Sequence, residues 1–343
     1  MKKYIKICLL LIILIFSMKN INAQQLPIYS QYMFNEYLLN AAYSGTYNFT
    51  PVILNHRDQW TGFGDSAPQT SSLSMHSPIS EKSSIGTAMI YDQTNPISKT
   101  QIELNYGYRT LLGRKSNLML SMALSGTYNI LQFTRQENGT YSEITEGIID
   151  ITNQMNESYT VADINFGIVL FNDYFDCGIS IRNLLAPEVL SNNIDNNIER
   201  VKYLIIHASY LGLNNRSSPI GMIPSLVIRK MGIINYQGII QADINLKVIY
   251  RNKIWAGISY RSHEKAISPT IGINTKKAFF GYSYDIGTSS LGTYHNGSHN
   301  IAIGFKLGRN KTKNTRQQTP LYLNIDSEWK RLKISDMRNK STI

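Results

Sequence analysis

The feature that most constrains this chain is a regular alternation of apolar and polar residues, which recurs in several long stretches. Between Ile240 and Tyr250 every second side chain is apolar, and the positions between them are mainly polar, including Asp243 and Lys247. Neighbouring side chains of a β-strand point to opposite faces, so this two-residue period predicts a strand with one apolar face. Similar alternation recurs within residues 102–109, 118–129, 162–168 and 300–307.

The length of these stretches separates two all-β folds. A strand of eleven residues rises roughly 33 Å, and at a tilt of about 40° it spans roughly 25 Å, the height of the apolar band of a transmembrane barrel. A soluble sandwich, the alternative, has strands of about 5–6 residues. Many of the 22 tyrosines stand near the ends of the stretches, where a barrel has aromatic girdles. These include Tyr91, Tyr128, Tyr203, Tyr250 and Tyr260. We therefore predict an antiparallel transmembrane β-barrel of the outer-membrane type.

We count fourteen candidate strands, an even number, as in bacterial single-chain barrels. They lie at about residues 50–57, 68–78, 84–92, 99–110, 117–132, 158–171, 174–183, 200–212, 219–231, 237–250, 252–261, 267–275, 277–286 and 298–308. Connections are mostly tight at 79–83, 111–116, 172–173, 213–218, 251 and 276, and long at 58–67, 93–98, 133–157, 184–199 and 287–297. This alternation predicts short periplasmic turns and long outer loops. The barrel would occupy residues 50–308, after an N-terminal plug segment over 24–49 and before a basic periplasmic tail over 309–343.

The first residues predict export. Lys2, Lys3 and Lys6 precede an apolar run over 7–16, and Ala23 stands before Gln24, the pattern of a signal peptide over 1–23 that is cleaved near Ala23. An uncleaved anchor is the alternative, but the run of about ten residues is shorter than the roughly 20 that a spanning helix needs. Cleavage would leave one cysteine, Cys177, and thus no intramolecular disulfide.

The distribution of charge argues against a nucleic-acid partner. The formal net charge is +11, of which residues 1–23 contribute +4 and residues 309–343 contribute +6. Residues 24–308 therefore carry about +1, so the excess positive charge is not on the folded surface that would contact nucleic acid.

Several motifs in the chain are similar to those of a known family. Residues 30–45 read SQYMFNEYLLNAAYSG, and HRDQWTGF (56–63), APQT (67–70), SMHSP (74–78), WAGISYR (255–261), GYSYD (281–285) and GSH (297–299) follow. Over about residues 28–308 the chain resembles the PorP/SprF family, outer-membrane proteins associated with type IX secretion and gliding motility in Bacteroidetes. Glu36 and Ala41 stand where the family usually has proline, and Asn300 where it usually has glutamate. These departures concern the rigidity of the N-terminal segment and the charge at position 300.

The resemblance implies a function that the alternation cannot give. It implies a non-enzymatic barrel that supports export or surface anchoring of a large secreted partner, such as an adhesin with a type IX C-terminal domain. The implied partners are this substrate, other components of the secretion machinery and outer-membrane lipid. The resemblance implies no cofactor.

Two other functional classes remain as alternatives. A diffusion porin would share the barrel, and a barrel hydrolase could place a serine, a histidine and a carboxylate on neighbouring strands. The sequence has no Gly-x-Ser-x-Gly motif, phosphate loop or dinucleotide fingerprint. Among the six histidines, His295 and His299 are four residues apart, but they lie in a loop and at a strand start, so we predict no metal site.

Charged residues on the polar faces of the strands should point into the lumen, because an Arg or Lys facing lipid at mid-membrane costs about 2–4 kcal/mol. The candidates are Glu103, Arg109, Asp163, Arg182, Asp243, Lys247, Arg261 and Asp285. They could brace the wall through charge-assisted hydrogen bonds, or they could line a substrate-selective pore.

Two segments are candidate partner-binding sites. Arg57, Gln59, Trp60 and Phe63 close the first strand and begin its outer loop, where two aromatic anchors suit a partner; an aromatic girdle with a folded-in loop is the alternative. In the tail, Trp329 has apolar neighbours at helical spacing, a pattern compatible with a short docking helix. A solvated tail without fixed structure is the other interpretation.

Overall fold

The computed structural model describes residues 30–47, 49–64, 67–112, 118–133, 158–172, 174–186, 201–211, 220–232, 239–251, 253–288 and 296–308. Three short helical turns come first: η1 (Ser30–Met33), α2 (Glu36–Leu39) and η2 (Ala41–Tyr43). The strands are β1 (Thr50–Asp58), β2 (Gln69–Pro78), β3 (Ser83–Thr94), β4 (Ile97–Leu111), β5 (Met119–Phe133), β6 (Ser158–Phe171), β7 (Phe175–Arg182), β8 (Tyr203–Tyr210), β9 (Ile220–Met231), β10 (Ile240–Tyr250), β11 (Ile254–Arg261), β12 (Ala266–Asn274), β13 (Ala278–Gly287) and β14 (Ser298–Leu307).

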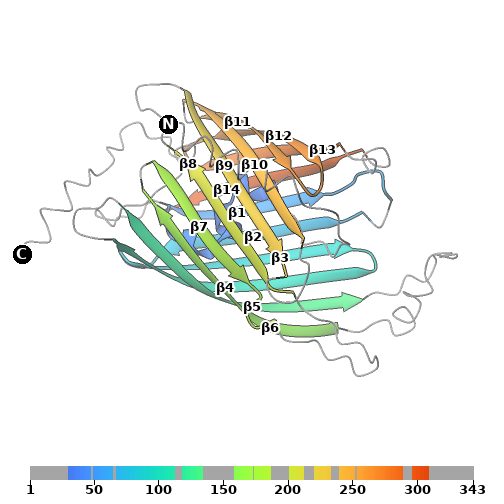
Figure 1. Ribbon diagram of the computed structural model, residues 1–343, viewed down its shortest axis with the longest axis horizontal. Helices are drawn as coiled ribbons and strands as arrows, with labels where there is room; N and C mark the ends of the chain where they lie inside the picture. Colours follow the sequence, from blue (N-terminus) through green and yellow to red (C-terminus); the bar gives the residue numbers. More distant parts are fainter. Residues whose placement is uncertain are drawn as a thin grey trace, which may run out of the picture.

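The strands form one closed antiparallel barrel (Figure 1). Each strand pairs with the next in sequence, and β1 pairs with β14 from Thr50↔Leu307 to Asp58↔His299, which closes the sheet. The predicted fold class, a barrel of fourteen strands, is confirmed. No helix within the described ranges is long and apolar enough to cross a membrane.

The two faces of the wall follow the predicted alternation. On β10, Ile244 is 61% exposed on the outer face, whereas Asp243 beside it is fully buried on the inner face. Outward-facing Ile, Leu, Phe, Met and Tyr side chains are exposed on thirteen of the strands, and on β6 the outward-facing Ile164, Phe166, Ile168 and Leu170 are partly exposed. A soluble protein rarely exposes an apolar patch larger than a few hundred Å². The outer face is therefore built for hydrocarbon, and each strand of the closed sheet pairs with a neighbour on both sides over at least part of its length.

The barrel has a turn end and a loop end. The turn end carries Thr50 and Leu307, and the loop end carries Asp58 and Ser298. At the loop end, the long connection predicted over 93–98 is wrong: β3 reaches Thr94 and β4 begins at Ile97. Both strands continue beyond their apolar stretch through pairs of mostly polar residues, which carry no apolar alternation.

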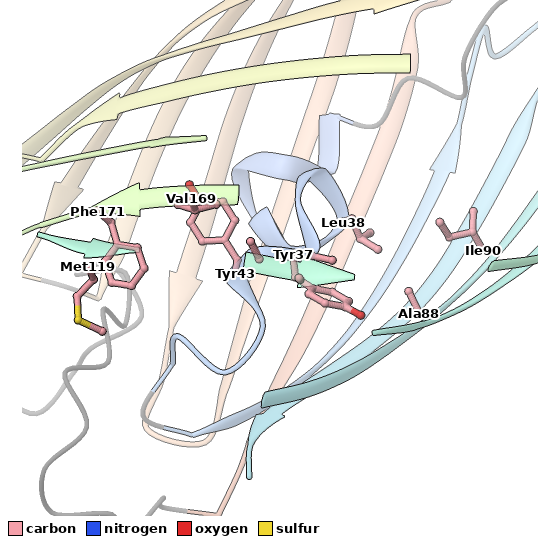
Figure 2. Close-up of a cluster of buried hydrophobic side chains, with 11 residues drawn as sticks. Tyr37, Leu38, Tyr43, Ala88, Ile90, Met119, Val169 and Phe171 are labelled. Carbon is pink, nitrogen blue, oxygen red and sulfur yellow. The ribbon is translucent and has the colours of Figure 1, made fainter. Parts of the chain in front are cut away.

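The buried core lies inside the barrel and is built from the segment before β1. Figure 2 shows Tyr37, Leu38 and Tyr43 of this segment within the ring of strands, against wall residues that include Val169 and Phe171. A second cluster joins Phe34, Tyr47 and Phe49 to other parts of the wall. Some inward-facing wall positions near this segment are therefore apolar, although many other lumen positions are polar. The predicted signal peptide and tail lie outside the described residues.

Candidate functional site

The lumen is occupied by residues 32–47, which we call the plug. Its side chains bond to the wall on several sides: Asn35 Nδ2 donates to Ser74 Oγ at 2.6 Å, and the Tyr37 hydroxyl donates to Asn105 Oδ1 at 2.7 Å. The Tyr43 hydroxyl donates to Asp176 Oδ1 at 2.6 Å. The acceptors lie on β2, β4 and β7, so the plug is tied across the lumen rather than to one side.

Asn40 is the plug residue with the most polar contacts. Its Nδ2 donates to the carbonyl oxygens of Ile168 and Ile179, at 3.1 and 3.2 Å, and its Oδ1 accepts the Ala42 N–H at 3.0 Å. The amide can come this close because Gly167 faces it, and a Cβ at that position would overlap the Asn40 side chain. The wall is therefore shaped to receive this residue.

Phe34 has a similar site on the opposite part of the wall. Its ring lies over Gly281 of β13, where a Cβ would overlap the ring, and its centroid is 4.9 Å from that of Trp255. Full burial of such a side chain stabilises a protein by roughly 1.5–3 kcal/mol. Polar bonds and apolar packing thus hold the plug at different positions around the barrel.

Three of the predicted lumen residues bind the backbone of the plug. Arg109 donates to the carbonyl oxygen of Gly45, Lys247 to that of Met33, and Arg182 to that of Leu38 at 2.9 Å. Arg182 also pairs with Glu103 at 2.6 Å. These cations balance carbonyl groups that the short helical turns of the plug leave without an internal partner.

A cluster of four charged residues lies near the loop end, inside the barrel. Arg57 Nη2 is 2.9 Å from Asp285 Oδ2 and 3.9 Å from Glu264 Oε1. Arg261 Nη1 is 3.0 Å from the same Asp285 oxygen and 2.8 Å from Glu264 Oε2. Both guanidinium groups are almost fully buried, so this cluster joins β1, β11 and β13 with the turn that carries Glu264.

The other predicted lumen residues have separate partners. Asp243 pairs with Arg229, and Asp163 accepts backbone N–H groups beyond the end of β7. All eight predicted residues lie on inward faces, but they form several groups rather than one network. The sequence pattern did not predict Arg229 and Glu264 as lumen residues. Arg229 lies on a strand whose two faces are both partly apolar, and Glu264 lies in a turn, where alternation gives no direction.

The first residues of the loop after β1 bond to the start of β14 and to the residues before it. Thr61 N–H donates to the Gly297 carbonyl at 2.8 Å, Asn296 N–H donates to the Thr61 carbonyl at 2.7 Å, and Trp60 N–H donates to Ser298 Oγ at 3.1 Å. The rings of Trp60 and Phe63 lie 6.2 Å apart, and Phe63 is 50% exposed.

The predicted partner-binding residues are therefore divided. Trp60 and Phe63 lie on the loop, whereas the Arg57 side chain belongs to the buried charged cluster and Gln59 is also buried. The alternation of Ile53, Asn55 and Arg57 on one face could have placed Arg57 inside. Trp329 lies outside the described residues.

No group of three or more His, Cys, Asp or Glu side chains within the described ranges is arranged to hold a metal ion. His76 and His207 instead contact the plug: His76 Nδ1 accepts the Gly45 N–H at 3.1 Å, and His207 lies 3.2 Å from the Tyr43 hydroxyl.

A family model described as "Type IX secretion system membrane protein PorP/SprF" matches residues 21–305 of the chain. None of the curated proteins compared with the chain matches it in sequence.

Similar solved structures include other barrels. The P. putida toluene transporter TodX is 8% identical with a TM-score of 0.46, over 79% of this chain and 94% of that one. The CymD monoaromatic hydrocarbon channel is 10% identical with a TM-score of 0.44, over 84% and 95%. The Acinetobacter baumannii outer membrane protein Omp33 is 6% identical with a TM-score of 0.42, over 76% and 98%.

Proposed function

The chain belongs to the PorP/SprF family of type IX secretion system membrane proteins, and we propose that it acts as a closed, non-enzymatic outer-membrane barrel that binds a secreted protein at its loop end. It is a type IX secretion component, and its wall is that of an outer-membrane barrel. The main support for partner binding is the loop that carries Trp60 and Phe63 and that bonds to the residues around the start of β14.

The plug favours this function over a diffusion porin. A porin needs an open aqueous lumen, whereas here the plug bonds to β2, β4, β7 and β10. The secreted protein would then not pass through this barrel. It would be exported by another component and would meet this chain at the cell surface.

The loop has the properties of a binding surface. Tryptophan and other aromatic side chains supply much of the energy of protein interfaces, and a fixed loop loses little conformational entropy on binding. Because Arg57 is buried in the charged cluster, the surface that we propose consists of Trp60 and Phe63 without Arg57. The partner implied by the family is a large adhesin-like type IX substrate, with other secretion components as neighbours.

A double variant tests the proposal. Trp60→Ala with Phe63→Ala should lower the amount of secreted protein that co-purifies with the tagged full-length barrel at least tenfold, as quantified by mass spectrometry. Tyr174→Ala is the matched control, because Tyr174 is an aromatic residue that is 63% exposed at the turn end. Unchanged recovery with the double variant, in a barrel that still folds, would refute the proposed surface.

A chemical test addresses the hydrolase alternative. A serine hydrolase would react covalently with a fluorophosphonate probe through an activated serine. We expect the purified full-length protein to remain unlabelled under conditions that label a known serine hydrolase.

A further inference from the structure

The wall of the barrel has a step at the loop end, between β6 and β7. β5 and β6 pair along nearly their whole length, from Met119↔Phe171 to Gln132↔Ser158. β6 and β7 pair only from Phe166↔Ile181 to Phe171↔Asp176. In Figure 1, β5 and β6 extend past the end of β7. Among the described strands, the loop-end part of β6 therefore pairs on one side only, with β5.

Asp163 turns the chain away from this part of β6. After Arg182, Asn183 has a φ of 55°, and Leu184 N–H donates to the Ile164 carbonyl at 2.9 Å. The Asp163 carboxylate then accepts the N–H of Leu185 at 3.0 Å and that of Ala186 at 3.2 Å. Because Asp163 points into the lumen, these bonds draw the chain inward, away from the edge of the sheet.

The backbone N–H and C=O groups of alternate β6 residues point toward this edge. Asn172 N–H bonds to the Phe175 carbonyl and the Ile164 carbonyl accepts from Leu184, so even-numbered residues of β6 face β7. In an antiparallel strand the N–H and C=O of one residue point to the same side. Thr160 and Ala162 therefore direct their backbone groups to the open side, where no strand of the described part of the chain pairs with them.

The edge lies in a place where a second chain could reach it. Tyr128 is outward-facing on β5 opposite Ala162, and residues 158–160 lie beyond it toward the loop end. If Tyr128 belongs to the aromatic girdle of the barrel, residues 158–160 extend toward the water. Ser158, Thr160 and Ala162 are exposed. The segment SYTVA has no charge and no proline, the features with which proteins usually protect an exposed edge.

Two exposed leucine side chains lie next to the edge. Leu184 is 38% exposed and Leu185 is 57% exposed, directly after the end of β7. An extended segment that pairs with β6 would continue the sheet over the end of β7 and could cover these two side chains. Backbone pairing would supply affinity, and the leucines would favour an apolar side chain of the partner.

We propose that residues Ser158–Ala162 of β6 bind an uncharged, extended segment of the secreted partner as an added β-strand. This inference rests on the proposed function, because it takes the partner to be the same secreted protein that meets Trp60 and Phe63. It adds a second binding surface with a different chemistry, backbone hydrogen bonding, which the aromatic loop does not provide.

A pair of variants at Thr160 tests the strand addition. Thr160→Pro removes the N–H on the open side and leaves pairing with β5 intact, since that pairing uses Tyr159 and Val161. Thr160→Ala removes the hydroxyl and a methyl group of the side chain but keeps the backbone N–H. In the full-length barrel, recovery of secreted protein should fall at least tenfold with proline and stay within twofold of wild type with alanine. Equal recovery with a folded Thr160→Pro barrel would overturn the inference.

The same experiment separates this inference from the proposed function. If the Trp60→Ala, Phe63→Ala variant loses the partner and Thr160→Pro keeps it, only the strand addition fails. If the wild-type barrel recovers no secreted protein, both fail. Should Thr160→Pro not fold, Ala162→Pro replaces it; failure of both to fold would mean that the barrel itself uses these N–H groups, which also overturns the inference.

Residue-resolved amide hydrogen exchange gives a readout that needs no partner. In the purified wild-type protein in detergent, the amides of Thr160 and Ala162 should exchange at least a hundredfold faster than that of Val161, which pairs with β5. Slow exchange at Thr160 and Ala162 would show that the chain covers its own edge, and the inference would be wrong.

Discussion

Asn40 shows how single residues determine what this barrel can do. Its side-chain amide is buried and bonds to two wall carbonyls and one plug N–H, and Gly167 provides the space for it. An unsatisfied buried polar group costs about 1–3 kcal/mol, so any movement of the plug that broke these bonds would need replacement partners. At the residue scale the plug is therefore a fixed part of the fold rather than a loosely held segment.

Arg57 provides a prediction at the same scale. Arg57→Ala removes one of the two guanidinium groups that pair with the buried carboxylate of Asp285, and breaking a buried ion pair costs about 3–5 kcal/mol. We expect a lower midpoint of urea unfolding in detergent, with partner binding per folded barrel unchanged. His56→Ala is the matched control, since His56 is the exposed neighbour on the same strand. Normal stability with lost binding would instead place Arg57 in the partner surface.

At the scale of elements, alternation in the sequence predicted the strands because every second side chain of a membrane-spanning strand faces lipid and must be apolar. β10 and β6 lie close to their expected bounds, since each has an apolar outer face opposite Asp243 or Asp163. β8, expected over 200–212, spans only Tyr203–Tyr210, because nothing in local alternation marks where a neighbouring strand stops pairing. The site was harder to predict: the contacts of Asn40, Tyr43 and His207 join residues more than 130 positions apart.

The glycine opposite Phe34 gives a prediction for the plug as an element. Gly281→Val places methyl groups where the ring of Phe34 lies, so the turn at Phe34 must move away from β13. We expect a protein that inserts as a barrel but unfolds at lower urea concentration and shows occasional ion currents. Gly126→Val is the matched control, because a Cβ at Gly126 on β5 meets no atom within 4 Å. Equal stability of the two variants would indicate that Phe34 does not anchor the plug.

At the scale of the whole molecule, two surfaces with opposite character explain the proposed function. The outer wall is apolar and suits a bilayer, and the lumen contains a plug that bonds to widely separated strands. We propose that a partner binds at the loop end, at Trp60, Phe63 and the side of β6 with which no described strand pairs. The sequence alone predicted the membrane wall. The position of the plug depends on contacts between residues that are far apart in the chain, and alternation carries no information about such contacts. Alternation therefore could not distinguish a plugged barrel from a diffusion porin.

The central claim, a barrel that is closed by its own N-terminal segment, is tested most directly by planar-bilayer conductance of the full-length protein. Because the plug is held by hydrogen bonds and by packing around the lumen, we predict no steady open-channel current from the wild type at moderate voltage, with an open porin as the positive control. A steady current of fixed conductance from the folded wild-type barrel would contradict the account.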